Sequence, residues 1–246
     1  MAEEQIKSTE HQETDFLFAK TYVCPVCNTT FKTLTVKASK PRLLRTDPDM
    51  RPVYRYIDVV KYDCVVCEKC GYAALTKYFD HISDTQIRII RQEISSKFKG
   101  LKHSGDKYTY DEAILRHRLA LASASVKHSK VSERAHICLK LAWLYRGKRD
   151  EIAVSDEKQK RELYNLEIGY VKKALEGFKS ARMNERFPIA GMDEWTFEFL
   201  LAELSIECNE LDDARKLISN IIFSSAPDRV KEKARDLKDY LNDIRV

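Results

Sequence analysis

The chain has 246 residues, of which 43% are hydrophobic and 33% are charged. This balance is typical of a water-soluble protein with a buried core, and no apolar run approaches the roughly 20 residues that a membrane span needs. The first 20 residues hold five acidic side chains, where a signal peptide has a basic start and an apolar middle. We therefore expect a cytoplasmic protein that contacts no membrane.

Composition divides the chain into three parts. Residues 1–18 are polar and acidic without periodicity, which predicts a disordered tail. Residues 19–80 hold five of the seven cysteines and two β-branched runs, 33–36 and 56–60, which predict short strands around a proline-containing loop. From residue 81 to residue 246 the pattern turns helical, so the predicted fold class is α+β: a small β module followed by a mostly α-helical domain.

The start of the helical part carries a recognisable signal. Ser83 and Gln86 fit a capping box, in which each side chain bonds the other residue's backbone N–H. Ile87, Ile90 and Ile94 then recur at three-to-four spacing and predict one apolar helix face.

Small residues at regular spacing indicate a repeat in the helical part. Ala202 is followed twelve positions later by Ala214 and then by Pro227, a spacing similar to that of the tetratricopeptide-type helix–turn–helix unit of about 34 residues. A second copy centres on Ala142 and Ala174, with about 20 additional residues that are inserted or lengthen the helices, and a weaker half-copy includes Ala113 and Ala120. Stacked repeats are the prediction, and an irregular helix bundle is the alternative.

Five cysteines gather at two places in the β module. Cys24 and Cys27 form one C-x-x-C pair, and Cys64, Cys67 and Cys70 follow at successive threes. A two-residue spacer lets one turn present both sulfurs to a single ion, and two such turns complete a tetrahedral zinc shell.

The expected backbone conformation of the two turns indicates which four of these five cysteines bind the metal. The residue after the second cysteine of a metal-binding turn favours a left-handed conformation, which asparagine and glycine tolerate best. Asn28 follows the first pair and Gly71 follows Cys70, whereas Glu68 follows Cys67. The predicted metal ligands are Cys24, Cys27, Cys67 and Cys70.

Alternatives to a structural zinc site remain at this point. Cys64 is a bystander at a strand end or an alternate ligand, and His81, the nearest histidine, has a surface or capping role or replaces a cysteine. A redox-active C-x-x-C and an iron–sulfur cluster are rival interpretations. A catalytic zinc keeps an open position for water, whereas four thiolates close the shell, so the zinc is predicted to be structural. No catalytic residue and no further cofactor site is predicted, and the protein is not expected to be an enzyme.

Two kinds of partner follow from the sequence. Stacked helix pairs offer a groove for a protein or peptide, which predicts a scaffold or adaptor role. The alternative is nucleic acid, because residues 30–61 carry eight basic and three acidic side chains interleaved with Phe31, Tyr54 and Tyr56. The other interpretation, which we favour, is that the two tyrosines form the module's own sparse core.

Several of these motifs occur together in one known family. They are the Tyr22–Cys27 run with C-P-V-C, Phe31, the Asp47-Pro48-Asp49 loop followed by Pro52 and Tyr54, Tyr62, and the C-E-K-C-G-Y-A-A run from Cys67 with Phe79. In this combination the chain resembles a bacterial family known as domain of unknown function 2225. The resemblance implies a bacterial cytoplasmic protein with a zinc-ribbon-like start followed by repeat-like helices, and it implies no activity.

Overall fold

The computed structural model describes residues 11–103, 105–153 and 155–243. Within these ranges the chain forms three two-stranded antiparallel sheets and then seven α-helices. The strands are β1 (Leu17–Val23), β2 (Thr30–Val36), β3 (Leu43–Thr46), β4 (Pro52–Tyr54), β5 (Cys64–Val66) and β6 (Ala73–Leu75). The helices are α1 (Asp84–Ile90), α2 (Tyr110–Val126), α3 (Val131–Asp150), α4 (Glu157–Asn184), α5 (Glu194–Glu207), α6 (Leu211–Phe223) and α7 (Asp228–Asp243). The predicted α+β class is confirmed.

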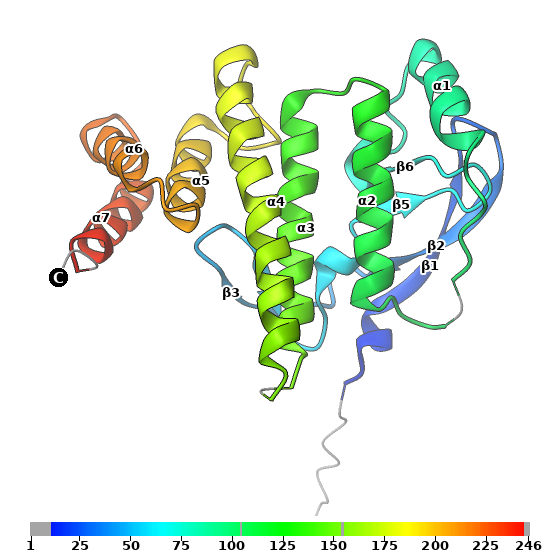
Figure 1. Ribbon diagram of the computed structural model, residues 1–246, viewed down its shortest axis with the longest axis horizontal. Coiled ribbons are helices and arrows are strands. Elements are labelled where there is room, and N and C mark those ends of the chain that lie inside the picture. Colours follow the sequence, from blue (N-terminus) through cyan, green and yellow to red (C-terminus); the bar gives the residue numbers. More distant parts are fainter. Residues whose placement is uncertain (1–10, 104, 154, 244–246) are drawn as a thin grey trace, which may run out of the picture.

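The helices form a row that turns away at its carboxyl end. In Figure 1, α2, α3 and α4 lie side by side, and α5, α6 and α7 continue beyond them. Short loops join α2 to α3, α3 to α4, α5 to α6 and α6 to α7, so the two helices of each pair turn back on one another. Among the described residues, no helix combines the length and the apolar composition that crossing a bilayer requires.

The small residues that suggested a repeat lie where helices approach one another. Ala142 of α3 and Ala174 of α4 are fully buried, as are Ala202 of α5 and Ala214 of α6, and each of these helix pairs is packed together. Most of the additional residues of the second copy lengthen α3 and α4. The tetratricopeptide character of these pairs stays a prediction.

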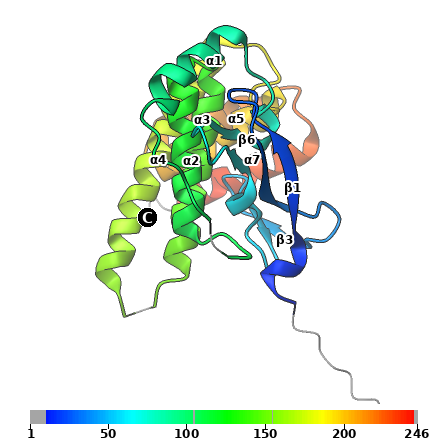
Figure 2. The same cartoon turned by 90° about the vertical axis from the view of Figure 1, so that its right-hand side faces the viewer.

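The β module and the helices share one hydrophobic core. The β5–β6 hairpin packs against α2, and Val66 and Leu75 belong to the same buried cluster as Ala120 and Ala124. A hydrogen bond from the Ala73 N–H to the Ser123 hydroxyl, 3.3 Å long, fixes the hairpin on the helix. The change in composition near residue 80 therefore does not coincide with a gap in packing. Figure 2 shows the β1–β2 hairpin beside the helical row.

Helix α1 folds back onto the cysteine-containing hairpins. Ser83 and Gln86 form the predicted capping box at its start, so this prediction is confirmed. Ile90 is buried in a second core that also contains Tyr72 and Phe79. A short π-helical turn, Arg91–Ser95, continues α1.

The predicted strand at 56–60 is wrong. Tyr56 has a positive φ of 68°, and the chain then enters a 3-10 helix at Val59–Tyr62. The Asp58 carboxylate caps this helix by accepting a hydrogen bond from the Val60 N–H. Local capping by aspartate thus outweighs the β propensity of the valines and isoleucine.

The predicted disordered tail extends too far along the chain. Residues 1–10 lie outside the described residues, but Glu13–Phe16 forms a 3-10 helix and β1 begins at Leu17. The Glu13 carboxylate lies 2.5 Å from the buried Lys61 ammonium and accepts a hydrogen bond from the Tyr62 hydroxyl. Because an ion pair and the buried Phe16 hold this segment, residues 13–18 are part of the fold.

A buried ion pair fastens the β3–β4 loop to α3. Asp49 is fully buried, and its carboxylate accepts a hydrogen bond from the Trp143 indole at 2.8 Å and forms an ion pair with Arg146 at 2.9 Å. The next residue, Met50, has a positive φ of 70°. This turn carries the loop from α3 toward α5, where Met50 approaches Phe199.

Candidate metal centre

Two similar turns present the cysteines of the β module. Cys24 and Cys27 lie in the turn between β1 and β2, and Cys67 and Cys70 lie in the turn between β5 and β6. In the first turn, a backbone N–H bonds back to the Cys24 carbonyl at 2.8 Å, and in the second turn one bonds back to the Cys67 carbonyl at 2.9 Å. Both turns therefore curl around their sulfurs in the same way.

The donors of these two hydrogen bonds are the residues that the sequence singled out. Asn28 has a φ of 57° and Gly71 has a φ of 77°. The prediction that both residues adopt the left-handed conformation is confirmed. Most residues with a Cβ are strained in this conformation, whereas glycine lacks a Cβ and asparagine tolerates it because its short polar side chain can hydrogen-bond locally.

The four sulfur atoms of these turns converge on one point. The Sγ atoms of Cys24, Cys27, Cys67 and Cys70 all lie within 4.8 Å of one another. Two of the sulfur pairs, Cys24–Cys70 and Cys27–Cys67, are 3.6 Å apart. Zinc–thiolate bonds of about 2.3 Å place tetrahedral sulfurs about 3.8 Å apart. The donor set therefore fits a single tetrahedral metal ion, and it leaves no space for a multi-iron cluster.

The surroundings keep water away from most of the cluster. Cys24 and Cys67 are fully buried, Cys70 is buried and Cys27 is half-buried. The neighbouring Cys24 and Cys70 side chains lower the pKa of Cys67. Four such sulfurs fill every coordination position of a tetrahedral ion and leave none open for a substrate or a water.

Cys64, the fifth cysteine, lies outside the cluster. Its buried Sγ donates to the Arg116 backbone carbonyl at 3.3 Å, and burial raises the pKa of this thiol to about 12. A neutral buried thiol with a protein partner is a core residue rather than a ligand. His81 is exposed and is also not part of the cluster.

Two neighbours of the metal centre were not foreseen from the sequence. Arg91 donates from Nε to the Val26 carbonyl at 2.9 Å, and so ties α1 to the first cysteine turn. Phe98 lies against Gly71 at the second turn. Neither contact has a local sequence signal, because each joins segments that only the fold brings together.

Replacing Gly71 by alanine is expected to lower the stability by about 2–4 kcal/mol, because a left-handed alanine is strained and an overpacked site adds to that cost. A Cβ on Gly71 would lie only 2.6 Å from the Phe98 ring. Urea unfolding and metal titration of the variant measure the effect, and we expect weaker metal retention as well.

Gly169→Ala is the matched control. Gly169 lies within α4, and a Cβ there would meet no heavy atom within 4 Å. This variant is expected to gain up to about 1 kcal/mol, because alanine favours a helix over glycine. Equal stability of the Gly71 variant and the unmodified protein would contradict the tight packing at the cysteine turn.

Two of the eight basic residues in the segment at 30–61 are used by the fold. Arg51 and Lys61 are buried and paired with Asp58 and Glu13. Phe31 packs against the core of the cysteine module. Five basic residues remain exposed, as does the Tyr56 ring: Lys32, Lys40, Arg42, Arg45 and Arg55.

Fold and site together define a class of protein. A four-cysteine cluster held by two hairpin turns is a zinc-ribbon-like module, and here it is joined to a mostly helical domain in an α+β protein. A family model described as an uncharacterized protein conserved in bacteria (DUF2225) matches residues 17–241. The chain belongs to this family, as the resemblance of its motifs indicated. No curated protein and no solved structure matches the chain.

Proposed function

We propose that the protein is a non-enzymatic zinc-binding adaptor, in which a structural zinc ion orders the cysteine module and the helical domain binds a protein partner. The convergence of four cysteine sulfurs carries this proposal. Thiolate ligands in tetrahedral geometry favour zinc, and a closed shell has a structural role rather than a catalytic one. The ligands would be Cys24, Cys27, Cys67 and Cys70.

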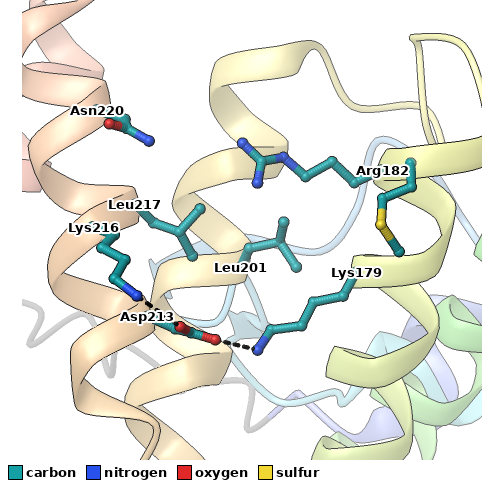
Figure 3. A pocket seen from close by; sticks show the side chains of 8 residues that line it. Lys179, Arg182, Leu201, Asp213, Lys216, Leu217 and Asn220 are labelled. Atoms are coloured by element: carbon teal, nitrogen blue, oxygen red, sulfur yellow. Dashed lines mark hydrogen bonds and ion pairs between the residues drawn. The ribbon is translucent and has the colours of Figure 1, made fainter.

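A groove between α4 and α6 is the best candidate for the partner site. Its volume is 410 Å³, and its lining includes Leu201 of α5 and Leu217 of α6. Figure 3 shows Lys179 and Arg182 reaching over this groove from α4, opposite Asp213, Lys216 and Asn220 of α6. Met183, also in the lining, is 78% exposed, although it is one of the larger apolar side chains. An apolar floor with a mobile methionine at its edge suits a peptide.

The charges on the groove indicate the chemistry of the occupant. Its lining residues include three cations and one carboxylate, and one of the cations, Arg182, is paired at 2.5 Å with Glu198, which lies outside the lining. The carboxylate, Asp213, pairs with Lys179 at 2.7 Å and lies 3.8 Å from Lys216. Lys179 also pairs with Glu210 at 2.5 Å. The pairs of Lys179 and Lys216 are partly exposed, so breaking them costs little. The occupant we propose is an amphipathic peptide segment of a partner protein, with apolar side chains flanked by aspartate or glutamate.

Selection from a display library of acidic amphipathic peptides, with the full-length zinc-loaded protein as bait, tests this proposal. We expect selected peptides to lose affinity by tenfold or more, about 1.4 kcal/mol, when Met183 is changed to glutamate. The new carboxylate repels an acidic peptide, and the exposed position spares the fold. Fluorescence anisotropy measures the affinity.

Tyr164→Glu provides the matched control, because Tyr164 is an exposed apolar side chain elsewhere on the same helix, α4. This variant should bind the selected peptides as the unmodified protein does. Failure to enrich any acidic peptide, or an equal loss in both variants, would count against the groove as the partner site.

A nucleic-acid function is the weaker proposal. Because Arg51 and Lys61 are committed to buried ion pairs, the 30–61 segment offers fewer free cations than its composition suggests. The support for this function is the exposed Arg55, whose guanidinium lies 4.8 Å from the centre of the exposed Tyr56 ring.

A further inference from the structure

A second hollow lies between the β3–β4 loop, α5 and α7. It has a volume of 310 Å³, and an adjoining hollow of 280 Å³ shares Met50, Phe199 and Lys233 with it. The two hollows therefore form one elongated cleft, which we call the loop–α7 cleft. The cleft is separate from the groove between α4 and α6, and none of the four proposed zinc ligands lines it.

The cleft contains a buried carboxylate without a partner. Glu203 of α5 is only 7% exposed and lines the cleft. In the described part of the chain, no side chain or backbone group forms a hydrogen bond or an ion pair with it. A buried carboxylate normally has such a partner, because removing it from water is costly. The carboxylate oxygens are not fully enclosed by protein, so they open into the cleft, where a ligand can reach them.

Other groups in the cleft define what kind of ligand fits. Asp47 and Asp236 add two more carboxylates, and Phe199 and Tyr240 add aromatic surface. Lys233 and Arg229 are the cations among the residues that line the two hollows, and the Lys233 ammonium lies 5.7 Å from the centre of the Phe199 ring. This contact shows that the cleft already accommodates an alkylammonium group from its own chain, at a site next to the unpaired Glu203.

A metal ion fits the cleft poorly. Within the described ranges, the cysteine cluster is the group of His, Cys, Asp or Glu side chains whose ligand atoms converge on one point. The carboxylates of the cleft do not converge in this way. Apolar walls formed by Met50, Phe199 and Leu237 instead favour a ligand with a hydrocarbon body.

We propose that the loop–α7 cleft binds a primary alkylammonium group, with the ammonium at Glu203 and the alkyl chain against Phe199 and Met50. A lysine side chain of a polypeptide and a free aliphatic amine share this chemistry. The ammonium supplies the hydrogen bonds and the charge that Glu203 lacks, and the aromatic faces attract the cation.

The titration of Glu203 provides an independent signature. Burial, together with the neighbouring Glu207 of α5 and Asp49 of the loop, raises its pKa to about 7, while Lys233 of α7 acts in the opposite direction. An ammonium ion binds the ionised carboxylate and not the neutral acid. Affinity should therefore increase between pH 6 and pH 8, as Glu203 loses its proton.

Titration of the zinc-loaded full-length protein, followed by NMR, tests the proposal with three probes. Nα-acetyl-lysine methylamide represents a lysine side chain, n-pentylamine represents a free amine, and 1-pentanol is the neutral control. We expect both amines to bind with higher affinity at pH 8 than at pH 6, and the alcohol to bind at least tenfold more weakly. Tighter binding of the lysine derivative assigns the ligand to a polypeptide, and tighter binding of pentylamine assigns it to a small amine.

Three variants complete the experiment. Glu203→Gln keeps the shape of the side chain and should weaken amine binding at least tenfold and remove its pH dependence. Lys233→Met removes the resident ammonium and should strengthen binding a few-fold. Glu232→Gln, an exposed carboxylate of α7 outside the cleft lining, should change nothing. Unchanged amine affinity in Glu203→Gln, equal binding of 1-pentanol, or no amine binding even in Lys233→Met would overturn the proposal.

Discussion

Changing Cys67 to serine is expected to abolish metal binding and to unfold the cysteine module. The proposed zinc ion contributes about 10–16 kcal/mol to a small fold, whereas a whole domain is stable by only about 5–15 kcal/mol. Cys67 is fully buried and its sulfur lies 3.6 Å from that of Cys27, so a weaker ligand at this position opens the shell. Elemental analysis should find one zinc per chain in the unmodified protein and none in the variant.

The unfolding should spread beyond the metal centre. The β5–β6 hairpin that carries Cys67 belongs to the same core as α2, and Phe98 packs on its turn. Circular dichroism should therefore show partial loss of helix when the metal is removed by a chelator, and recovery when zinc is added back.

Cys64→Ser is the control for this experiment. Cys64 is close in sequence and equally buried, but its sulfur bonds the Arg116 carbonyl. The variant should retain one zinc per chain and lose only about 1–2 kcal/mol, the cost of a polar group in a core position. Metal loss in Cys64→Ser, or a metal-free protein that is fully folded, would refute the four-ligand assignment.

Local chemistry explains why the metal centre was visible in the sequence. C-x-x-C spacing, with Asn28 after one pair and Gly71 after the other, encodes two complete turns within a few residues each. The fold has only to bring these turns together. The sequence could not show that Arg91 and Phe98 support the site, because their partners, Val26 and Gly71, are distant along the chain.

The wrong predictions about the fold also arise from contacts between residues that are distant along the chain or from local capping. Residues 56–60 have the composition of a strand, but a cap from Asp58 and a left-handed Tyr56 turn them into a bend and a 3-10 helix. In the sequence, Glu13 belongs to an acidic segment that resembles a disordered tail, but in the fold it forms an ion pair with Lys61. In the sequence, the basic segment has unpaired cations, but in the fold Arg51 and Lys61 form ion pairs with Asp58 and Glu13. Long-range ion pairs have no periodicity, so sequence patterns do not reveal them.

Replacing Arg146 by methionine is expected to lower the free energy of unfolding by about 3–5 kcal/mol, because the change leaves buried carboxylates without their cation. The Arg146 guanidinium lies 2.9 Å from Asp49, 2.6 Å from Glu167 and 3.1 Å from Glu207. It therefore joins the β3–β4 loop, α4 and α5 at one point of α3. Methionine keeps much of the apolar stem, so the effect reports the charge rather than a cavity.

The loss of stability should depend on pH. Burial and the nearby Asp49 raise the pKa of Glu207 to about 7, while Arg146 acts to lower it. Without Arg146 this pKa rises further above its unfolded value, so the folded state binds a proton that the unfolded state releases. Stability of the variant must then fall as pH increases from 5 to 8, and the difference from the unmodified protein must be larger at pH 8 than at pH 6.

Urea unfolding at several pH values measures this effect, and Arg215→Met is its control. Arg215 pairs with Asp212, whose side chain is 88% exposed, and an ion pair of this kind contributes at most about 1 kcal/mol. The control should lose little stability and show no change in pH dependence. If Arg146→Met proves as stable as Arg215→Met at pH 8, the buried carboxylates do not depend on this cation. The β3–β4 loop would then be held by the Trp143 hydrogen bond and by packing, and the loop–α7 cleft would keep its shape without the ion pair.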